Sequence, residues 1–329
     1  MSKVFVIGDG GWGTALALLM HSQGNDTVLW SAFPEYAEYL RKNRENTKFL
    51  EGVPLPEDLE ITSDAEAAEK AEYVFFVVPS KYLRPVVEKF RNVKAPYIIS
   101  AIKGIENGSL KRPSEVLREY FPESHISVLS GPSISYEVAR SFPTTVVVAS
   151  QEESRFDIQK LLTTECFRVY TLTDTIGAEL GGALKNIIAI AAGISDGLGF
   201  GTNSKAALLT RGLAEIIRLG VKMGAEKETF SGLSGIGDLT TTCISLHSRN
   251  RWFGEQIGKG RNIKDVLHET EMVVEGLATC KAAYELSKKY EVVMPITEKI
   301  YEVVHEGKDP KVAVKELMTR DLKDENFNY

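Results

Sequence analysis

The order of short apolar segments in the first half of the chain most constrains its fold. Apolar runs at residues 4–7, 27–30, 71–78, 97–101, 126–129 and 144–149 predict strands, and the patterns at residues 14–21 and 34–43 predict helices. Strands that are apolar throughout are typical of a parallel sheet covered on both faces. The alternation therefore predicts an α/β domain with a mostly parallel sheet.

The first predicted strand leads directly into a glycine-rich turn. Residues 8–13 read Gly-Asp-Gly-Gly-Trp-Gly, which has the spacing GxGxxG, and a helical pattern follows at once. In this context Gly8 permits a tight turn, Gly10 lets the backbone approach a pyrophosphate, and Gly13 lets the helix pack against the sheet. The free N–H groups of the helix N-terminus would bind the phosphates. The turn predicts a Rossmann-type dinucleotide-binding domain.

The end of the second strand usually distinguishes the two nicotinamide dinucleotides. An acidic residue there favours NAD through the ribose hydroxyls, and a basic residue accommodates the NADP phosphate. This chain has Ser31, Ala32 and Phe33, and the nearest charged candidates are Glu35 and Arg41. The choice between NAD and NADP stays open at this level.

The second half of the chain has helical periodicity. From Gly177 onward apolar residues recur at i, i+3 and i+4, and the segments 206–223, 275–290 and 295–305 predict further helices. We therefore expect two domains: a dinucleotide-binding domain at residues 1–175 and an all-helical substrate and catalytic domain at residues 176–329. A cleft between them is the expected site.

Lys185 is a candidate acid–base group in this helical half. It lies one turn after Gly181, in the sequence Gly-Gly-Ala-Leu-Lys-Asn at residues 181–186. Glycines inside a helix cost about 1 kcal/mol each relative to alanine, which suggests that they admit a substrate or nicotinamide. An apolar stretch follows, and a lysine in such surroundings tends towards a lowered pKa. The alternative is a lysine that extends from a core helix to solvent.

Two further segments carry charge suited to a substrate. Asp238 ends the glycine-rich segment 232–238 and could orient a lysine or a substrate hydroxyl, or simply cap a helix. Arg249, within the Ser-Arg-Asn-Arg segment 248–251, suits a phosphate, because a guanidinium binds its oxygens bidentately. The alternative for the arginines of this segment is a solvated charged face.

Several loops follow predicted strands of the first half. They contain Pro79, Lys103, and the Gly131 and Ser133 of a Gly-Pro-Ser segment. The carboxyl ends of strands in α/β sheets are where ligands bind. Ordinary turn chemistry is the alternative for each loop.

Composition narrows the functional class. The net charge of −6 argues against a general nucleic-acid binder, and we expect no membrane partner because no apolar run approaches the ~20 residues of a membrane helix. The three cysteines have neither metal-ligand spacing nor a disulfide framework. We therefore expect reduced thiols, no metal site and a cytoplasmic location.

Taken together, the motifs resemble those of bacterial NAD(P)-dependent glycerol-3-phosphate dehydrogenases. The resemblance extends from residue 3 to about residue 307, and the joint order and spacing of the segments carry it. The matching segments are GDGGWGTALA (8–17), VVPS (77–80), SAIKGIE (100–106), LSGPS (129–133), ELGGALKNIIAIAAGI (179–194), KAALLTRGLAE (205–215), FSGLSGIGDLTTTC (230–243), HSRNRWFG (247–254) and VVEG (273–276).

This resemblance implies an oxidoreductase that interconverts dihydroxyacetone phosphate and sn-glycerol 3-phosphate with NAD or NADP. Such an enzyme would supply glycerol 3-phosphate for phospholipid synthesis. Members often have His or Arg where this chain has Ala32 and Phe33, which keeps the cofactor preference open. A homodimer is expected because closed twofold dimers are the commonest assembly. The alternatives are a β-hydroxyacid dehydrogenase of the same architecture and a catalytically silent NAD(P)-binding sensor.

The resemblance also implies roles for individual positions. Lys185 is expected to donate the proton to the developing alkoxide, Lys103 to stabilise its negative charge, and Asp238 to orient the lysines. The residues expected to bind the phosphorylated substrate are Lys103, Gly131, Ser133, Asn186, Thr242, Ser248, Arg249 and Asn250. Those expected to bind the cofactor are Gly8, Gly10, Gly11, Trp12, Gly13, Phe33, Pro79, Lys103, Ser135, Arg249, Val273 and Glu275.

Overall fold

The chain divides into two compact units in the computed structural model, which describes residues 1–322 and 324–325. The first unit contains Met1–Lys103 and Lys111–Glu179, and the second contains Gly104–Leu110 and the chain from Leu180 onward. The division falls within helix α7 (Thr175–Gly197). Each unit has a hydrophobic interior of its own.

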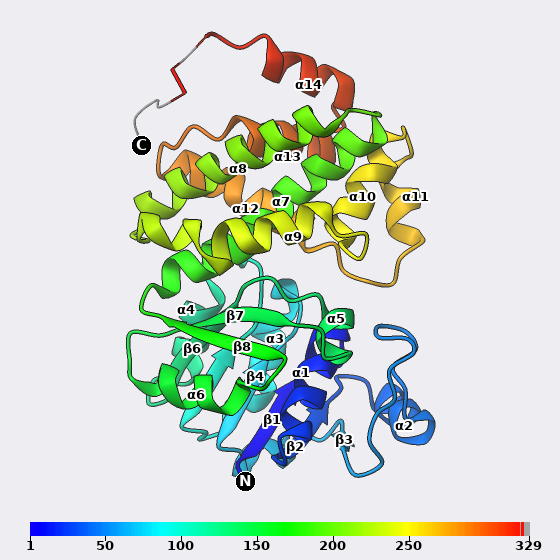
Figure 1. The fold of residues 1–329 in the computed structure, drawn as a ribbon, viewed down its shortest axis with the longest axis vertical. Helices are drawn as coiled ribbons and strands as arrows, with labels where there is room; N and C mark the ends of the chain where they lie inside the picture. Colours follow the sequence, from blue (N-terminus) through cyan, green and yellow to red (C-terminus); the bar gives the residue numbers. More distant parts are fainter. Residues whose placement is uncertain (323, 326–329) are drawn as a thin grey trace. The chain divides into compact units, whose positions relative to one another are not determined.

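The first unit is built on an eight-stranded sheet with the strand order β3-β2-β1-β4-β5-β6-β7-β8 (Figure 1). Neighbouring strands are parallel except for the antiparallel pair β6 and β7, so the expected mostly parallel sheet is confirmed. The strands are β1 (Lys3–Ile7), β2 (Asp26–Trp30), β3 (Glu60–Thr62), β4 (Tyr73–Phe76), β5 (Tyr97–Ser100), β6 (His125–Ser130), β7 (Thr144–Ala149) and β8 (Phe167–Leu172).

Two of these strands were not expected from the sequence, and one is shorter than expected. β3 has three residues, and β8 is an edge strand on which exposed Arg168 and Tyr170 alternate with buried residues. Neither gives the continuous apolar run of a central strand. β4 ends at Phe76, although the Val77 N–H still donates to the Ile7 carbonyl oxygen of β1 at 2.9 Å.

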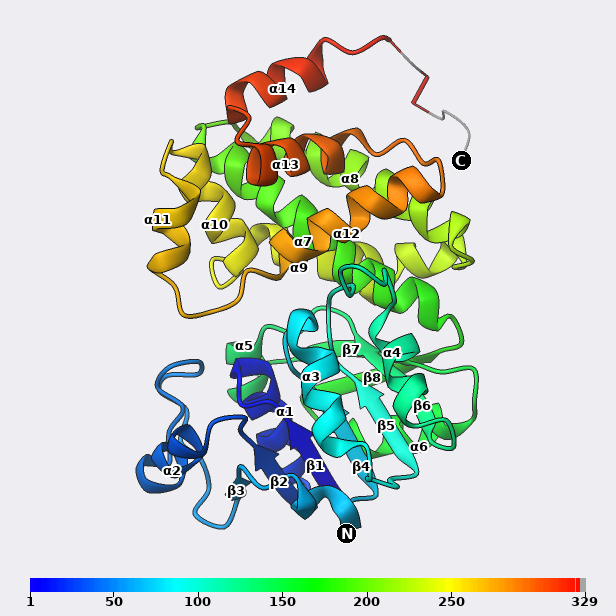
Figure 2. The ribbon, with the colours of Figure 1, turned by 180° about the vertical axis from the view of Figure 1, so that it is seen from behind.

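Strict alternation of side chains gives the sheet two buried faces. Val4 and Val6 of β1 pack on one face, whereas Phe5 and Ile7 pack on the other. The first face is covered by α1 (Gly11–Ser22), α2 (Pro34–Asn43), α5 (Ser135–Ala139) and α6 (Ser154–Leu162). The second is covered by α3 (Leu83–Val87), α4 (Pro113–Tyr120) and the 3₁₀ turns η1 (Glu66–Lys70) and η3 (Glu88–Phe90). Figures 1 and 2 show the sheet from its two sides.

The second unit is helical, as expected. Its elements after α7 are α8 (Thr202–Lys222), η4 (Lys227–Ser231), η5 (Leu233–Gly237), α9 (Asp238–Ile244), α10 (Arg249–Gly258), α11 (Ile263–His268), α12 (Glu275–Lys289), α13 (Pro295–Glu306) and α14 (Pro310–Met318). Proline begins α13 and α14, and Gly307 ends α13 in a left-handed conformation. These signals mark the bounds of α13, which was expected at residues 295–305, whereas α14 was not expected.

α7 is the central helix of the second unit. By length and composition it is apolar enough to cross a membrane, which corrects the expectation that no segment approaches that length. However, 94% of its most apolar window is buried inside the protein, as befits a core helix. A Cβ atom on Gly254 of α10 would lie 2.0 Å from the Ile190 carbonyl oxygen of α7. The missing side chain therefore lets α10 lie directly against the helix that carries Lys185 and Asn186.

Candidate functional site

The glycine-rich turn has the geometry that its sequence predicts. Gly8 has a φ of +119°, and a Cβ atom on Gly13 would lie 1.9 Å from the Gly8 carbonyl oxygen. Only glycine at position 13 allows α1 to begin so close to β1. A Cβ atom on Gly10, by contrast, would meet no atom within 4 Å. Gly10 therefore borders open space at the N-terminus of α1, as close approach of a pyrophosphate requires.

Asn46 braces this turn, and the sequence did not identify it. Its side-chain amide donates to the Asp9 carbonyl oxygen at 2.8 Å and to Thr14 Oγ1 at 2.7 Å. Its own oxygen accepts a hydrogen bond of 2.7 Å from the Tyr36 hydroxyl. Asn46 lies between predicted elements, so no periodicity or motif marks it. Its side chain is buried and fixes the loop that would face the pyrophosphate.

Other predicted cofactor residues surround the same turn. The Trp12 indole Nε1 is buried and has no hydrogen-bond partner within residues 1–322 and 324–325. A Cβ atom on Gly11 would lie 2.9 Å from Ser135 Oγ, so these two predicted residues are neighbours. Phe33 is 61% exposed where β2 leads into α2, and Pro79 follows β4. An unpaired donor and an open glycine turn fit a bound dinucleotide.

Lys103 joins the loops that follow two neighbouring strands. It lies after β5, and its ammonium donates to the Gly131 carbonyl oxygen at 2.8 Å and to Ser133 Oγ at 3.2 Å, both after β6. Gly131 has a φ of +118°, which turns its carbonyl within reach of the lysine. The three residues predicted from separate segments therefore form one cluster at the carboxyl edge of the sheet.

Lys185 of α7 lies in a buried polar cluster of the second unit. Its ammonium donates to Asp238 Oδ1 at 2.6 Å and to Thr242 Oγ1 at 2.5 Å. The Thr242 hydroxyl donates in turn to the Asp238 carbonyl oxygen at 2.7 Å. Lys185 is 5% exposed and Asp238 is 1% exposed. Lys185 therefore does not extend to solvent, and Asp238 is its ion-pair partner as well as the first residue of α9.

The glycine before this lysine has a different role from the one the sequence suggested. A Cβ atom on Gly181 would lie 2.3 Å from the Ser234 carbonyl oxygen. The expectation that this glycine admits a ligand is therefore wrong, because the backbone of η5 fills the space. The close contact instead brings η5, and Asp238 directly after it, to the Lys185 face of α7.

Arg249, in the first turn of α10, has a partly buried guanidinium. Burial lowers the pKa of Arg249 to about 10, and among the described residues no carboxylate contacts it. Its neighbour Arg251 instead pairs with Asp196 at 2.8 Å and with Glu255 at 3.4 Å. Partial burial of a guanidinium without an acidic partner is unfavourable. Arg249 is therefore suited to bind an anion, whereas Arg251 is a structural ion-pair residue.

The residues on either side of Arg249 form hydrogen bonds that fix the start of α10. Asn250 donates to Asn186 Oδ1 at 2.9 Å and accepts from the Gly276 N–H at 2.9 Å. Ser248 caps α10 by accepting from the Arg251 N–H at 3.3 Å. The amide pair links α7, α10 and the start of α12, where the predicted residues Val273 and Glu275 lie. Both are partly exposed.

Comparison with known proteins decides the family. Residues 3–156 match the N-terminus of NAD-dependent glycerol-3-phosphate dehydrogenases, and residues 174–315 match the C-terminus. The chain belongs to this family. A glycerol-3-phosphate dehydrogenase [NAD(P)+] of Desulfitobacterium hafniense is 49% identical over 99% of this chain and 93% of its own length. One of Pelotomaculum thermopropionicum is 51% identical over 97% of this chain and 93% of its own length.

Solved structures of the glycerol-3-phosphate dehydrogenase family share the fold. The Coxiella burnetii enzyme is 38% identical, with a TM-score of 0.93 over 97% of this chain and 99% of its own length. The Saccharomyces cerevisiae enzyme is 26% identical, with a TM-score of 0.81 over 97% of this chain and 99% of its own. A D-mandelate dehydrogenase, 13% identical with a TM-score of 0.64 over 94% of this chain and 99% of its own, shares the fold alone.

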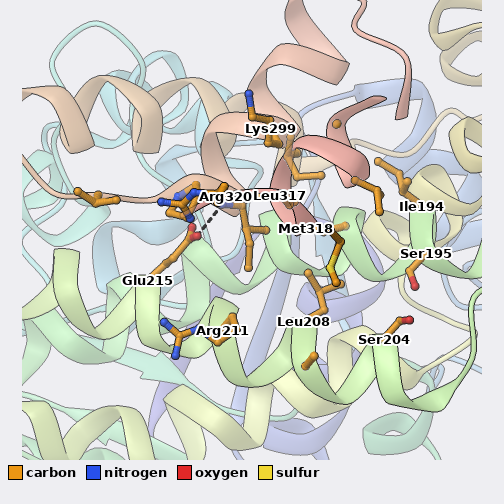
Figure 3. Close-up of a pocket in the computed structure, with 18 of the residues that line it drawn as sticks. Ile194, Ser195, Ser204, Leu208, Arg211, Glu215, Lys299, Leu317, Met318 and Arg320 are labelled. Carbon is orange, nitrogen blue, oxygen red and sulfur yellow. Dashed lines mark hydrogen bonds between the residues drawn. The ribbon is translucent and has the colours of Figure 1, made fainter. Parts of the chain in front are cut away.

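The second unit has a large apolar cavity, and none of the predicted site residues lines it. It has a volume of about 1050 Å³ in the second unit and is lined by α7, α8, α13 and α14 (Figure 3). Figure 3 shows Leu208 of α8 with Leu317 and Met318 of α14 along it. Glu215 lies at its inner wall, accepting hydrogen bonds from the Ile296 and Thr297 N–H groups at 2.6 and 3.0 Å. Burial raises the pKa of Glu215 to about 7.

A metal centre was not expected from the sequence. Within the part of the chain that the structure describes, no group of three or more His, Cys, Asp or Glu residues could hold a metal ion. Cys243 and Cys280 are buried, and burial raises the pKa of both thiols. These cysteines are core residues of the second unit.

Proposed function

We propose that this chain interconverts dihydroxyacetone phosphate and sn-glycerol 3-phosphate by hydride transfer with NAD(H) or NADP(H). The observation that carries the proposal is the buried Lys185, whose ammonium is held by Asp238 Oδ1 at 2.6 Å and Thr242 Oγ1 at 2.5 Å. A charged lysine fixed in low dielectric surroundings is suited to deliver a proton to a developing alkoxide. Membership of the family supports the choice of substrate.

In this proposal the first unit binds the dinucleotide, which supplies or accepts the hydride when bound. The Gly10 turn and the N-terminus of α1 receive its pyrophosphate, and the unpaired Trp12 N–H is available as a donor. Lys103, held by Gly131 and Ser133, contributes a positive charge at the carboxyl edge of the sheet. Its proposed role is to stabilise negative charge on the substrate oxygen.

The second unit is proposed to bind and protonate the substrate. Arg249 binds the phosphate, since its guanidinium is partly desolvated and no acidic side chain of the described residues contacts it. Asn186 and Asn250, fixed by their mutual hydrogen bond, add amide groups beside it. Binding energy from the phosphate would then orient the carbonyl group towards Lys185, which protonates its oxygen as the C–H bond forms.

The metabolic role, the cellular location and the oligomeric state of the chain are also proposed. Supply of glycerol 3-phosphate to phospholipid synthesis follows from the product of the reaction. A cytoplasmic location agrees with three thiols that form no disulfide. A homodimer is proposed because twofold symmetric pairs are the commonest assembly of such enzymes.

The test is initial-rate turnover of dihydroxyacetone phosphate with NADH and, separately, with NADPH, followed by nicotinamide absorbance. Turnover with either cofactor is expected, and Arg249→Met should raise KM for the substrate by about tenfold to a hundredfold, as loss of a charge-assisted hydrogen bond does. Arg251→Met is the matched control, because Arg251 is already paired with Asp196. If the chain instead turned over unphosphorylated hydroxy acids, a β-hydroxyacid dehydrogenase would be favoured. If it bound the cofactor but turned over no substrate, a sensor would be favoured.

A further inference from the structure

The carboxylate of Asp9 lies at the end of the second strand. Asp9 is the second residue of the glycine-rich turn, and Ser31 is the residue that follows β2. The Ser31 hydroxyl donates to Asp9 Oδ2 at 2.5 Å. Ser31 is fully buried, whereas Asp9 is partly exposed, so the carboxylate is anchored from the protein side by a buried donor.

This position matters because the end of β2 discriminates between the two dinucleotides. An acidic side chain there accepts hydrogen bonds from the ribose hydroxyls of NAD, and its charge repels the 2′-phosphate of NADP. The three residues that follow β2 in the chain, Ser31, Ala32 and Phe33, are not acidic. The fold supplies a carboxylate at this place from a different segment, because the turn after β1 and the end of β2 are neighbours in the parallel sheet.

We propose that Asp9 is the residue that makes NAD(H) the preferred cofactor of this chain. The inference rests on the proposed dehydrogenase function only for its kinetic readout. Asp9 would accept hydrogen bonds from the adenosine ribose hydroxyls, and would oppose a dianionic phosphate at the same position by charge repulsion and by the absence of donors.

The surroundings of Asp9 fix its position. Its carbonyl oxygen accepts from the Asn46 amide at 2.8 Å, so both its backbone and its side chain are held. Burial raises the pKa of the Asp9 carboxyl, and the hydrogen bond from Ser31 and the charge of Lys48 oppose that rise. The Lys48 ammonium lies over the rings of Phe49 and Tyr36, at 5.3 and 5.9 Å from their centroids.

The positive charge of Lys48 could oppose the effect of Asp9 on cofactor preference. A lysine near the ribose could attract the NADP phosphate and offset the effect of Asp9. Arg41, on α2 after β2, is already engaged by Glu38 at 2.6 Å and by the Ile61 carbonyl oxygen at 3.5 Å. The anchored carboxylate is expected to outweigh Lys48, and the cofactor preference of the wild type measures which of the two charges dominates.

The experiment compares wild type with Asp9→Asn in two assays. Calorimetric titration gives Kd for NADH and NADPH without any substrate, and steady-state turnover gives kcat/KM for each. Wild type is expected to prefer NADH. Asp9→Asn keeps the shape and the Ser31 hydrogen bond but removes the charge, so the NADH-to-NADPH ratio of affinities should fall by about tenfold to a hundredfold.

The control is Asp58→Asn, which removes the charge of an 83% exposed carboxylate in the same unit and should leave the ratio unchanged. If Asp9→Asn fails to fold, Asp9→Ser removes the same charge. Equal wild-type affinity for the two cofactors, or an unchanged ratio in the variant, would overturn the proposal. Normal cofactor discrimination without turnover of dihydroxyacetone phosphate would instead refute the proposed reaction and leave the role of Asp9 intact.

Discussion

The Lys185–Asp238 pair allows stability and chemistry to be separated by mutation. Both side chains are almost fully buried, at 5% and 1% exposure, and their charged atoms are 2.6 Å apart. Lys185→Met leaves the Asp238 carboxylate buried without its cation, which typically costs about 3–5 kcal/mol. Because a whole domain is stable by only about 5–15 kcal/mol, this loss should be plain in urea unfolding.

The double variant Lys185→Met with Asp238→Asn removes both charges. It should be more stable than Lys185→Met alone, since no unpaired charge remains in the interior. Its kcat for dihydroxyacetone phosphate should nevertheless stay at least about a hundredfold below wild type, as loss of an acid–base group predicts. Recovered stability without recovered activity would show that the loss of activity is not a consequence of the loss of stability.

The matched control is Lys259→Met. Lys259 also pairs with a carboxylate, Glu255 at 2.7 Å, but it is 51% exposed, so the variant should lose less than about 1 kcal/mol and keep its kcat. Two results would refute the reasoning. A double variant no more stable than Lys185→Met would show that the pair is not energetically coupled, and near-normal kcat in Lys185→Met would remove Lys185 as proton donor.

Two further predictions concern the glycine turn and the buried carboxylate. Gly13→Ala should lower Tm because its Cβ would lie 1.9 Å from the Gly8 carbonyl oxygen, whereas Gly10→Ala should keep Tm but weaken NADH binding by calorimetry; equal effects on Tm would contradict this. Burial raises the pKa of Glu215 from 4.5 to about 7, so between these values the folded chain keeps a proton that the unfolded chain releases. Stability contributed by Glu215 should therefore fall as pH rises, by up to about 1.4 kcal/mol per pH unit, and Glu215→Gln should lack this slope in urea unfolding. Parallel wild-type and variant profiles would argue against it.

Local pattern was sufficient for the central strands and the longest helices of the fold. The central strands are apolar because both faces of the sheet are covered, and α2 and α13 begin at prolines that also appear in the sequence pattern. β3 and β8 were not predicted because an edge strand is covered less completely and has no continuous apolar run. The long α7 was predictable as a helix, but its burial depends on what packs around it.

Residue types indicated several candidates for the site, but not what they contact. Lys185 is more than fifty positions away from both Asp238 and Thr242 in the chain, and only folding brings it within hydrogen-bond distance of them. Arg249 and Arg251 are indistinguishable in sequence, and the structure leaves one without a carboxylate partner among the described residues while pairing the other with Asp196. Gly181 was expected to make room for a ligand, but in the structure it makes room for the backbone of Ser234.

The sequence by itself determined the glycine turn, the alternation of strands and helices, and the set of charged residues that mark the family, because these depend on neighbours along the chain. Only the tertiary structure decided that Asn46 braces the turn and that the Asp9 carboxylate lies against Ser31 at the end of β2. The physical reason is that hydrogen bonds and ion pairs act over about 3 Å in space. Their partners are set by the packing of the sheet and helices, which local periodicity does not encode.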